Sequence, residues 1–75
     1  MIETTAFRIR AYGVGELAVC YNPHLTRRAA IMQLWRWINY QHALKDKLAA
    51  LGYRPGLRSF TPKMVACIVE HLGEP

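Results

Sequence analysis

The regular pattern of the chain starts with a short alternation of apolar and polar side chains. Residues 7–11 have the sequence Phe-Arg-Ile-Arg-Ala, and a period of two is typical of a strand with one buried face. From residue 14 to 21 the apolar side chains take helical spacing instead. Asn22-Pro23 ends that helix, because the residue before a proline avoids the α conformation. The pattern therefore predicts a strand at about 7–11 and a helix at about 14–21.

The strongest amphipathic pattern covers residues 26–38. Thr26 is a good N-cap, since its hydroxyl can accept one of the unpaired backbone N–H groups of the first turn. Around the helix axis the apolar side chains fall on one broad face. That face consists of Ala30, Ile31, Leu34, Trp37 and Ile38. A helix at about 26–38 that packs this face against a core is the prediction.

A further helix is expected at about 40–51, with Asn39 as its cap. Its inward stripe would be Leu44, Leu48 and Leu51, and Gly52 would provide the left-handed residue that ends many helices. A continuous helix from 26 to 51 is the alternative. A break near Asn39 is favoured, because a rod of that length leaves the core of a small domain hard to close.

Turn signals separate this helix from the last one. Arg54-Pro55-Gly56-Leu57 is a turn in which proline fixes φ and the glycine accepts a positive φ. A second strand at about 57–60 would follow it and pair with the first strand. Thr61-Pro62 is an N-cap followed by a proline at the first helical position. It opens a helix at about 62–72 that buries Val65, Ile68 and Leu72 and that Gly73 ends.

Composition agrees with a small folded domain. The 75 residues are 52% hydrophobic, which is too apolar for a disordered chain, and this length fits one domain. We therefore expect a single domain over 1–75 that is mainly α. It would have four short helices and a small two-stranded β element in a winged helix-turn-helix-like arrangement.

Cys20 and Cys67 both occupy apolar positions of predicted helices. A free cysteine behaves as a small hydrophobe, and a secreted scaffold of this length usually carries more cysteines. Buried free thiols are expected, with a disulfide as the alternative. The N-terminus lacks a basic region followed by an apolar one, and no apolar run reaches the roughly 18 residues of a membrane span. A cytoplasmic location is expected.

The sequence does not predict catalysis, a metal site or a cofactor. His24, His42 and His71 have no serine, cysteine or carboxylate at a spacing that suggests a nucleophile with its base. No pairing of Cys and His matches a zinc site. Residues 13–15, Gly-Val-Gly, are only a fragment of a dinucleotide-binding motif. We expect a non-enzymatic protein with no cofactor, no metal and no small-molecule substrate.

Basic residues predict a nucleic-acid partner. The formal net charge is +5, which favours contact with phosphate. The helix at 14–21, the proline turn and the helix at 26–38 have the outline of a helix-turn-helix, whose second helix enters the major groove of DNA. Arginine there can donate two hydrogen bonds to guanine or bind phosphate. The predicted DNA-binding residues are Arg27, Arg28, Arg36, Arg54 and Arg58, with Lys45, Lys47 and Lys63 as further phosphate contacts.

Two alternatives to DNA binding remain open. The basic side chains would also suit a solvated helix face. Met32, Trp35 and Tyr40 would instead form an exposed apolar patch, which marks a protein interface. Trp35 lies at the edge of the apolar face, so core packing is its other interpretation. On this alternative the chain is a protein-interaction or homodimerisation module that does not bind nucleic acid.

Several segments together suggest a family. They are Phe7–Gly13, Glu16–Ala18, Leu51–Tyr53, Phe60–Pro62 and His71–Pro75, with Ala30, Leu34, Arg36 and Trp37 between them. This combination resembles a family of short proteins from gut anaerobic bacteria that is known as a domain of unknown function. The resemblance implies a complete small protein, and it implies no activity.

A looser likeness concerns the order of the motifs. Glu16-Leu17-Ala18 in the first helix and Phe60-Thr61-Pro62 before the last one are similar to the winged-helix domains of mercury-resistance-type regulators and phage excisionases. That likeness implies that Arg27, Arg28 and Arg36 lie on a recognition helix and that Arg54 and Arg58 lie on a wing. The chain departs from it in its longer turn and in the additional helix at 40–51.

Overall fold

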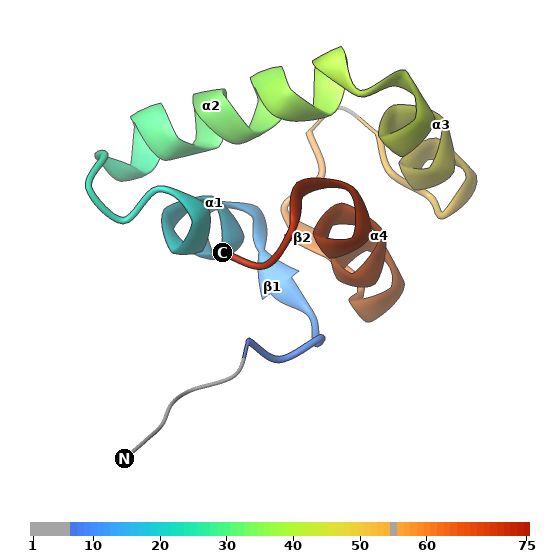
Figure 1. Cartoon of the computed structure of the whole chain (residues 1–75), viewed down its shortest axis with the longest axis horizontal. Coiled ribbons are helices and arrows are strands. Elements are labelled where there is room, and N and C mark those ends of the chain that lie inside the picture. Colours follow the sequence, from blue (N-terminus) through green and yellow to red (C-terminus); the bar gives the residue numbers. More distant parts are fainter. Residues whose placement is uncertain (1–6, 55) are drawn as a thin grey trace.

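The fold consists of four helices and two very short strands (Figure 1). The computed structural model describes residues 7–54 and 56–75. Along the chain the elements are β1 (Tyr12–Gly13), α1 (Val14–Tyr21), α2 (Arg27–Tyr40), α3 (His42–Ala50), β2 (Ser59–Phe60) and α4 (Pro62–Leu72). Helix α2 spans one side of the molecule, with α1 under its N-terminal half and α3 beyond its C-terminal end (Figure 1). The mainly helical fold class with a two-stranded sheet is confirmed.

The sheet is shorter than predicted, and its first strand lies elsewhere. β1 and β2 pair antiparallel, with Tyr12 opposite Phe60 and Gly13 opposite Ser59. The strand predicted at 7–11 is wrong, because β2 offers only two residues to pair with before α4 begins. Only the second half of the strand predicted at 57–60 forms. Leu57 and Arg58 come before it, although the Val14 N–H donates to the Arg58 carbonyl at 2.9 Å and extends the pairing by one bond.

The helix boundaries follow the capping signals closely. The Thr26 hydroxyl accepts the Ala29 N–H, and the Thr61 hydroxyl accepts the Met64 N–H, each at 3.2 Å. Pro62 occupies the start of α4. The bounds of α1 and α4 agree with the predicted ranges, and both threonine caps are confirmed. The turn between α1 and α2 is closed by the Leu25 N–H, which donates to the Asn22 carbonyl at 3.1 Å.

The predicted break between the second and third helices exists, but it lies at Gln41. Gln41 has φ −97° and ψ 88°, outside the helical region. Its N–H still bonds to the carbonyls of Trp37 and Ile38. Asn39 therefore lies inside α2 and caps nothing, because the helix continues through one more residue. The continuous helix is excluded, and the break turns α3 back so that Leu44 can reach the core.

Glycines with positive φ end or turn the chain at the predicted places. Gly52 (φ 103°) follows α3, Gly56 (φ 85°) lies in the loop before β2, and Gly73 (φ 84°) follows α4. Each adopts a conformation that side chains disfavour. Pro55, predicted to precede Gly56 in the turn, lies outside the described residues.

The core gathers buried side chains from every element. Those with no exposed surface include Leu17, Ala30, Leu34, Ile38, Leu44, Leu48, Val65 and Ile68. Leu51, predicted to point inward, is 38% exposed because α3 ends before it. Ile31, Trp37 and Leu72 are only partly buried at the edge of the core.

The two cysteines occupy different environments. Both are free, which excludes the disulfide, and Cys67 is buried as expected, whereas Cys20 is exposed. Burial raises the pKa of the Cys67 thiol. The expectation of two buried thiols is thus wrong for Cys20, which lies on the exposed side of α1.

Candidate nucleic-acid interface

An open groove of about 790 Å³ lies between α2, α3 and the loop that leads to β2. We call it the basic groove. Three cationic side chains line it: Arg27 from α2, Lys45 from α3 and Arg58 from the loop. Apolar side chains line it as well, among them Ile31, Trp35, Tyr53 and Leu57. Among its described lining residues there is no aspartate or glutamate.

Arg27 is seated against the first turn of α1. Gly15 is buried there, and a Cβ atom on Gly15 would lie 2.8 Å from Arg27 Nη2 and 2.9 Å from Cζ. Only the missing side chain of Gly15 lets the guanidinium come this close. Helix α1 therefore holds the first arginine of α2 at the edge of the basic groove, although neither residue was predicted to depend on the other.

An aromatic cluster fixes the opposite wall. The rings of Trp35 and Tyr53 have centroids 5.5 Å apart, and each lies 6.4 Å from the ring of Phe60. Such spacings are typical of packed aromatic side chains. Burial raises the pKa of Tyr53. The cluster packs the loop after α3 against the middle of α2, and two of its members, Trp35 and Tyr53, line the groove.

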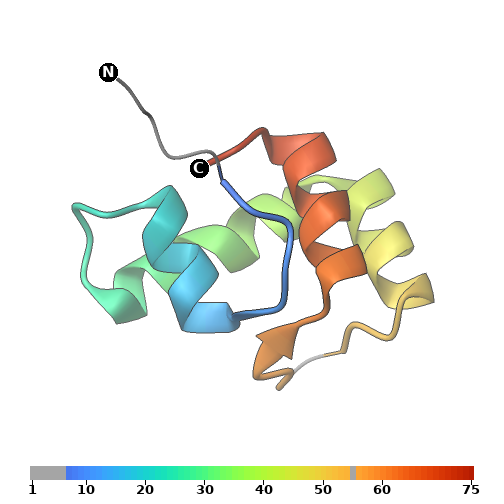
Figure 2. The ribbon, with the colours of Figure 1, turned by 90° about the horizontal axis from the view of Figure 1, so that it is seen from below.

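Backbone pairing places Arg58. Its carbonyl accepts the Val14 N–H at 2.9 Å, next to the two-residue sheet. Figure 2 shows the segment before β2 lying beside the start of α1. The Arg58 side chain is exposed. The loop thus brings a cation of the predicted wing to the groove that Arg27 lines.

The predicted DNA-binding residues are only partly brought together. Arg27 and Arg58 line the basic groove, and Lys45 joins them. Arg28 and Arg54 are exposed but do not line it. Arg36 lines a second, smaller hollow. The arginines of the prediction are thus divided between neighbouring parts of the surface.

That second hollow contains the predicted interface. Met32, Trp35 and Tyr40 line it together with Arg36 and Asn39, and its volume is about 400 Å³. Met32 is 57% and Tyr40 76% exposed. Trp35 is partly buried and lines both this hollow and the basic groove. Trp35 packs against the core while part of it stays accessible, so core packing is confirmed in part and its role in an interface stays a prediction.

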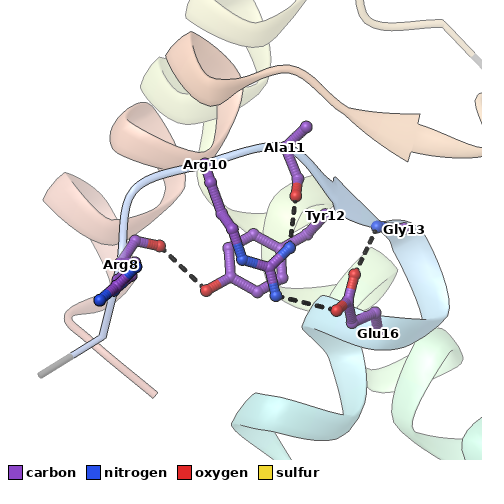
Figure 3. A network of polar contacts seen from close by, with 6 residues as sticks. All are labelled: Arg8, Arg10, Ala11, Tyr12, Gly13 and Glu16. Carbon is purple, nitrogen blue, oxygen red and sulfur yellow. Dashed lines mark hydrogen bonds and ion pairs between the residues drawn. The ribbon is translucent and has the colours of Figure 1, made fainter. Parts of the chain in front are cut away.

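A separate polar network surrounds the start of α1 (Figure 3). Arg10 Nη2 donates to Glu16 Oε2 at 2.9 Å, and its guanidinium lies 3.7 Å from the centre of the Tyr12 ring. Glu16 Oε1 accepts the Gly13 N–H at 3.1 Å, and the Tyr12 hydroxyl donates to the Arg8 carbonyl at 2.9 Å. Hydrogen bonds from Arg10 and then from Gly13 lower the pKa of Glu16. The network stabilises the segment that leads into α1.

Sequence reasoning did not find this network. The sequence did contain a signal for it. In a capping box, a glutamate at the third helical position bonds back to the residue that precedes the helix. Gly13 has no side chain to complete the box, so Glu16 bonds only to its backbone. The other partner, Arg10, comes from the segment that was predicted as a strand.

Among the described residues, no carboxylate forms an ion pair with the cations of the basic groove. Within residues 7–54 and 56–75 the ion pairs are Arg10 with Glu16 at 2.9 Å and Lys47 with Glu70 at 3.7 Å. Neither pair involves Arg27, Lys45 or Arg58. Lys47, predicted as a phosphate contact, pairs with Glu70 of α4. The basic groove is consequently the described surface where unpaired cations from three segments meet.

Two further observations concern metal ions and membranes. In the part of the chain that the structure describes, no three His, Cys, Asp or Glu side chains form a group suited to a metal ion. The helices described in residues 7–54 and 56–75 include none with the length and apolar character needed to span a bilayer.

These features define the class of the protein. A helix pair joined by a turn, a two-stranded sheet formed by β1 and β2, and a closing helix are consistent with a small winged-helix-like domain. The chain belongs to the family described as Domain of unknown function (DUF4248), whose model matches residues 8–75. The family expected from the sequence is thereby confirmed. No curated protein and no solved structure matches the chain.

Proposed function

We propose that the protein binds double-stranded DNA through the basic groove and the first turns of α2. The observation that carries this proposal is that Arg27, Lys45 and Arg58 line one groove without a carboxylate among its described lining residues. Cations from separate elements can contact phosphates along a duplex, and such contacts orient a domain on DNA. The net charge of +5 attracts the same partner at longer range.

The first turn of α2 would supply contacts to bases. Arg28 is exposed next to Arg27 on the helix that follows the turn, and in a helix-turn-helix these positions enter the major groove. Arg58 would lie on the neighbouring phosphate backbone. This arrangement needs no catalytic group, so the protein acts by binding alone.

Binding of a labelled duplex, followed by fluorescence anisotropy over a series of salt concentrations, tests the proposal. The logarithm of the affinity should fall linearly with the logarithm of the salt concentration. In the double variant Arg27→Ala with Arg58→Ala the affinity should drop, and the slope should become shallower by about two, one for each lost phosphate contact.

The matched control is Arg8→Ala with Lys47→Ala, which removes the same charge outside the basic groove. It should keep most of the affinity. Absence of binding at low salt, or an equal loss in both double variants, would contradict the proposal.

A second candidate function is association with a protein, including another copy of the chain. The exposed Met32 and Tyr40 around the second hollow favour it. Light scattering of the protein and of Tyr40→Lys measures it, because a charge at the centre of an apolar interface should dissociate a dimer. A monomer at high protein concentration would count against self-association.

A further inference from the structure

The basic groove has an apolar lining that DNA binding does not use. Ile31, Trp35, Tyr53 and Leu57 line it beside the three cations. A duplex presents phosphates and sugars to a protein at such a place, and phosphate contacts require donors and positive charge. The apolar side chains would remain partly wet against a duplex. A different ligand is needed to use both the charge and the apolar lining.

Size and composition both indicate a small molecule. Pockets for small ligands commonly measure about 300–1,000 Å³ and are mainly apolar, with a few polar groups that converge on the ligand. The basic groove, at about 790 Å³, lies in this range. All of its charged lining side chains are cationic among the described residues, so the polar part of the ligand is an anion.

We propose that the basic groove binds an amphipathic carboxylate, with its apolar body on Ile31, Trp35 and Leu57 and its carboxylate between Arg27 and Arg58. Guanidinium groups suit this role because they donate paired hydrogen bonds in the plane of a carboxylate. Lys45, which also lines the groove, adds a third positive charge. The inference does not depend on DNA binding.

Parts of the groove are already held in place. Gly15 admits the Arg27 guanidinium against α1, and the rings of Trp35, Tyr53 and Phe60 pack on one another. A ligand that enters this site has little side-chain freedom to remove from the aromatic wall, which favours binding. Trp35 and Tyr53 of this wall line the groove and can contact an apolar body.

Titration with decanoate, followed by the two indole N–H signals in a nitrogen–proton NMR spectrum, tests the inference. The chain has two tryptophans. Trp35 lines the basic groove, whereas Trp37 lines another hollow beside Tyr21. Single variants Trp35→Phe and Trp37→Phe assign the signals. Decanoate should shift the Trp35 signal saturably and leave the Trp37 signal in place.

Two further probes separate the two halves of the ligand. Decyltrimethylammonium has the same chain with the opposite charge, and acetate has the charge without the chain. Both should bind at least about ten-fold more weakly than decanoate, since each lacks one of the two interactions. Equal binding of either probe, or equal shifts of both indole signals, would overturn the proposal.

Variants locate the carboxylate. Arg27→Ala and Arg58→Ala should each weaken decanoate binding by about five-fold, as expected for an exposed charge pair. Arg8→Ala and Lys63→Ala, outside the groove lining, should leave it unchanged. An unchanged affinity in Arg27→Ala and Arg58→Ala would place the ligand elsewhere and sink the idea.

Competition distinguishes this inference from the proposed function. If both hold, decanoate should release the labelled duplex, because the two ligands share Arg27 and Arg58. A protein that binds decanoate but no duplex keeps the inference and loses the proposed function. A protein that binds the duplex, but whose Trp35 signal does not shift with decanoate, keeps the proposed function and loses the inference.

Discussion

At the scale of single residues, the site depends on a glycine. Gly15 lies in the first turn of α1, buried, and the Arg27 guanidinium lies where it would clash with a Cβ atom on Gly15. Glycine is usually unfavourable inside a helix, so its presence there has a local cost. The close approach of Arg27 gives that cost a structural reason. The same approach makes the position of the arginine sensitive to one methyl group.

Replacing Gly15 with alanine should therefore separate folding from binding. The helical preference of alanine would add roughly 0.5–1 kcal/mol, so the free energy of unfolding should stay constant or rise. The displaced Arg27 should weaken duplex binding by about five-fold. Urea unfolding and anisotropy measure the two effects.

Gly13→Ala is the control for this change. A Cβ atom on Gly13 would meet only the Glu16 Cβ, at an ordinary 3.7 Å, and nothing of Arg27. It should bind the duplex as the unchanged protein does. An unchanged duplex affinity in Gly15→Ala would show that the contact between Arg27 and Gly15 does not contribute to binding.

Tyr21 gives stability a dependence on alkaline pH. Burial, followed by the charges of Cys20 and Glu74, raises its pKa from 10.0 to about 12, and its hydroxyl donates to the Gly73 carbonyl. Because the folded state holds the proton more tightly, the stabilisation is complete below pH 10 and is lost as the pH rises from 10 towards 12. The loss is modest, since the ring is partly open to solvent.

Urea unfolding at a series of pH values should show this decline, and Tyr21→Phe should remove part of it. Tyr53 and Cys67, whose pKa values burial also raises, account for a remaining slope in the variant. An identical pH dependence in both proteins would mean that Tyr21 ionises with equal ease in the folded and unfolded states.

At the scale of elements, local signals predicted where helices begin and end. Thr26, Thr61, Pro62 and Gly73 act within one turn of the backbone, so their effect can be deduced without knowing the fold. The strand at 7–11 could not be judged this way, because a strand exists only with a partner. The break at Gln41 has no strong local signal either, because its position depends on the packing of α3 against the core.

The N-cap of α2 supports the candidate site directly. Thr26→Ala removes the hydroxyl that accepts the Ala29 N–H at 3.2 Å and should cost about 1 kcal/mol of the free energy of unfolding. It should also loosen the first turn, where Arg27 and Arg28 lie, and so weaken duplex binding. Thermal unfolding and anisotropy follow the two changes.

Thr26→Ser keeps the capping oxygen and serves as the control. It should retain most of the stability and affinity that the alanine variant loses. If serine and alanine behave alike, the cap is not what orders this turn.

At the scale of the whole molecule, Phe60 joins the parts that form the groove. It is 1% exposed, it pairs with Tyr12 in the sheet, and its ring packs on Trp35 and Tyr53. This residue therefore connects β2 with β1, with α2 and with the loop after α3. Packing at this position controls both the stability of the domain and the shape of the basic groove.

Phe60→Ala should cost about 3–5 kcal/mol. The 75 residues of the chain correspond to a total stability of roughly 4–11 kcal/mol, so the variant should be largely destabilised at moderate temperature. Circular dichroism during urea unfolding measures this. Tyr40→Ala, at a 76% exposed position, should change the stability by no more than about 0.5 kcal/mol. Similar losses of stability in the two variants would show that Phe60 has no central role in packing.

The sequence by itself determined the four helices, their threonine and glycine ends, and the basic character of the chain. These depend on side-chain chemistry and on spacings within a few residues. It also identified Arg27 and Arg58 as candidate DNA-binding residues, but it did not show that they line the same groove.

Only the tertiary structure decided which charges meet. Arg27, Lys45 and Arg58 belong to three separate segments, and packing around Phe60 and the short pairing beside Val14 bring those segments together. The same packing turned Lys47 toward Glu70 and left Arg36 in another hollow. Local patterns carry no information about such distances, because contacts between distant segments depend on how all the helices fit around one core.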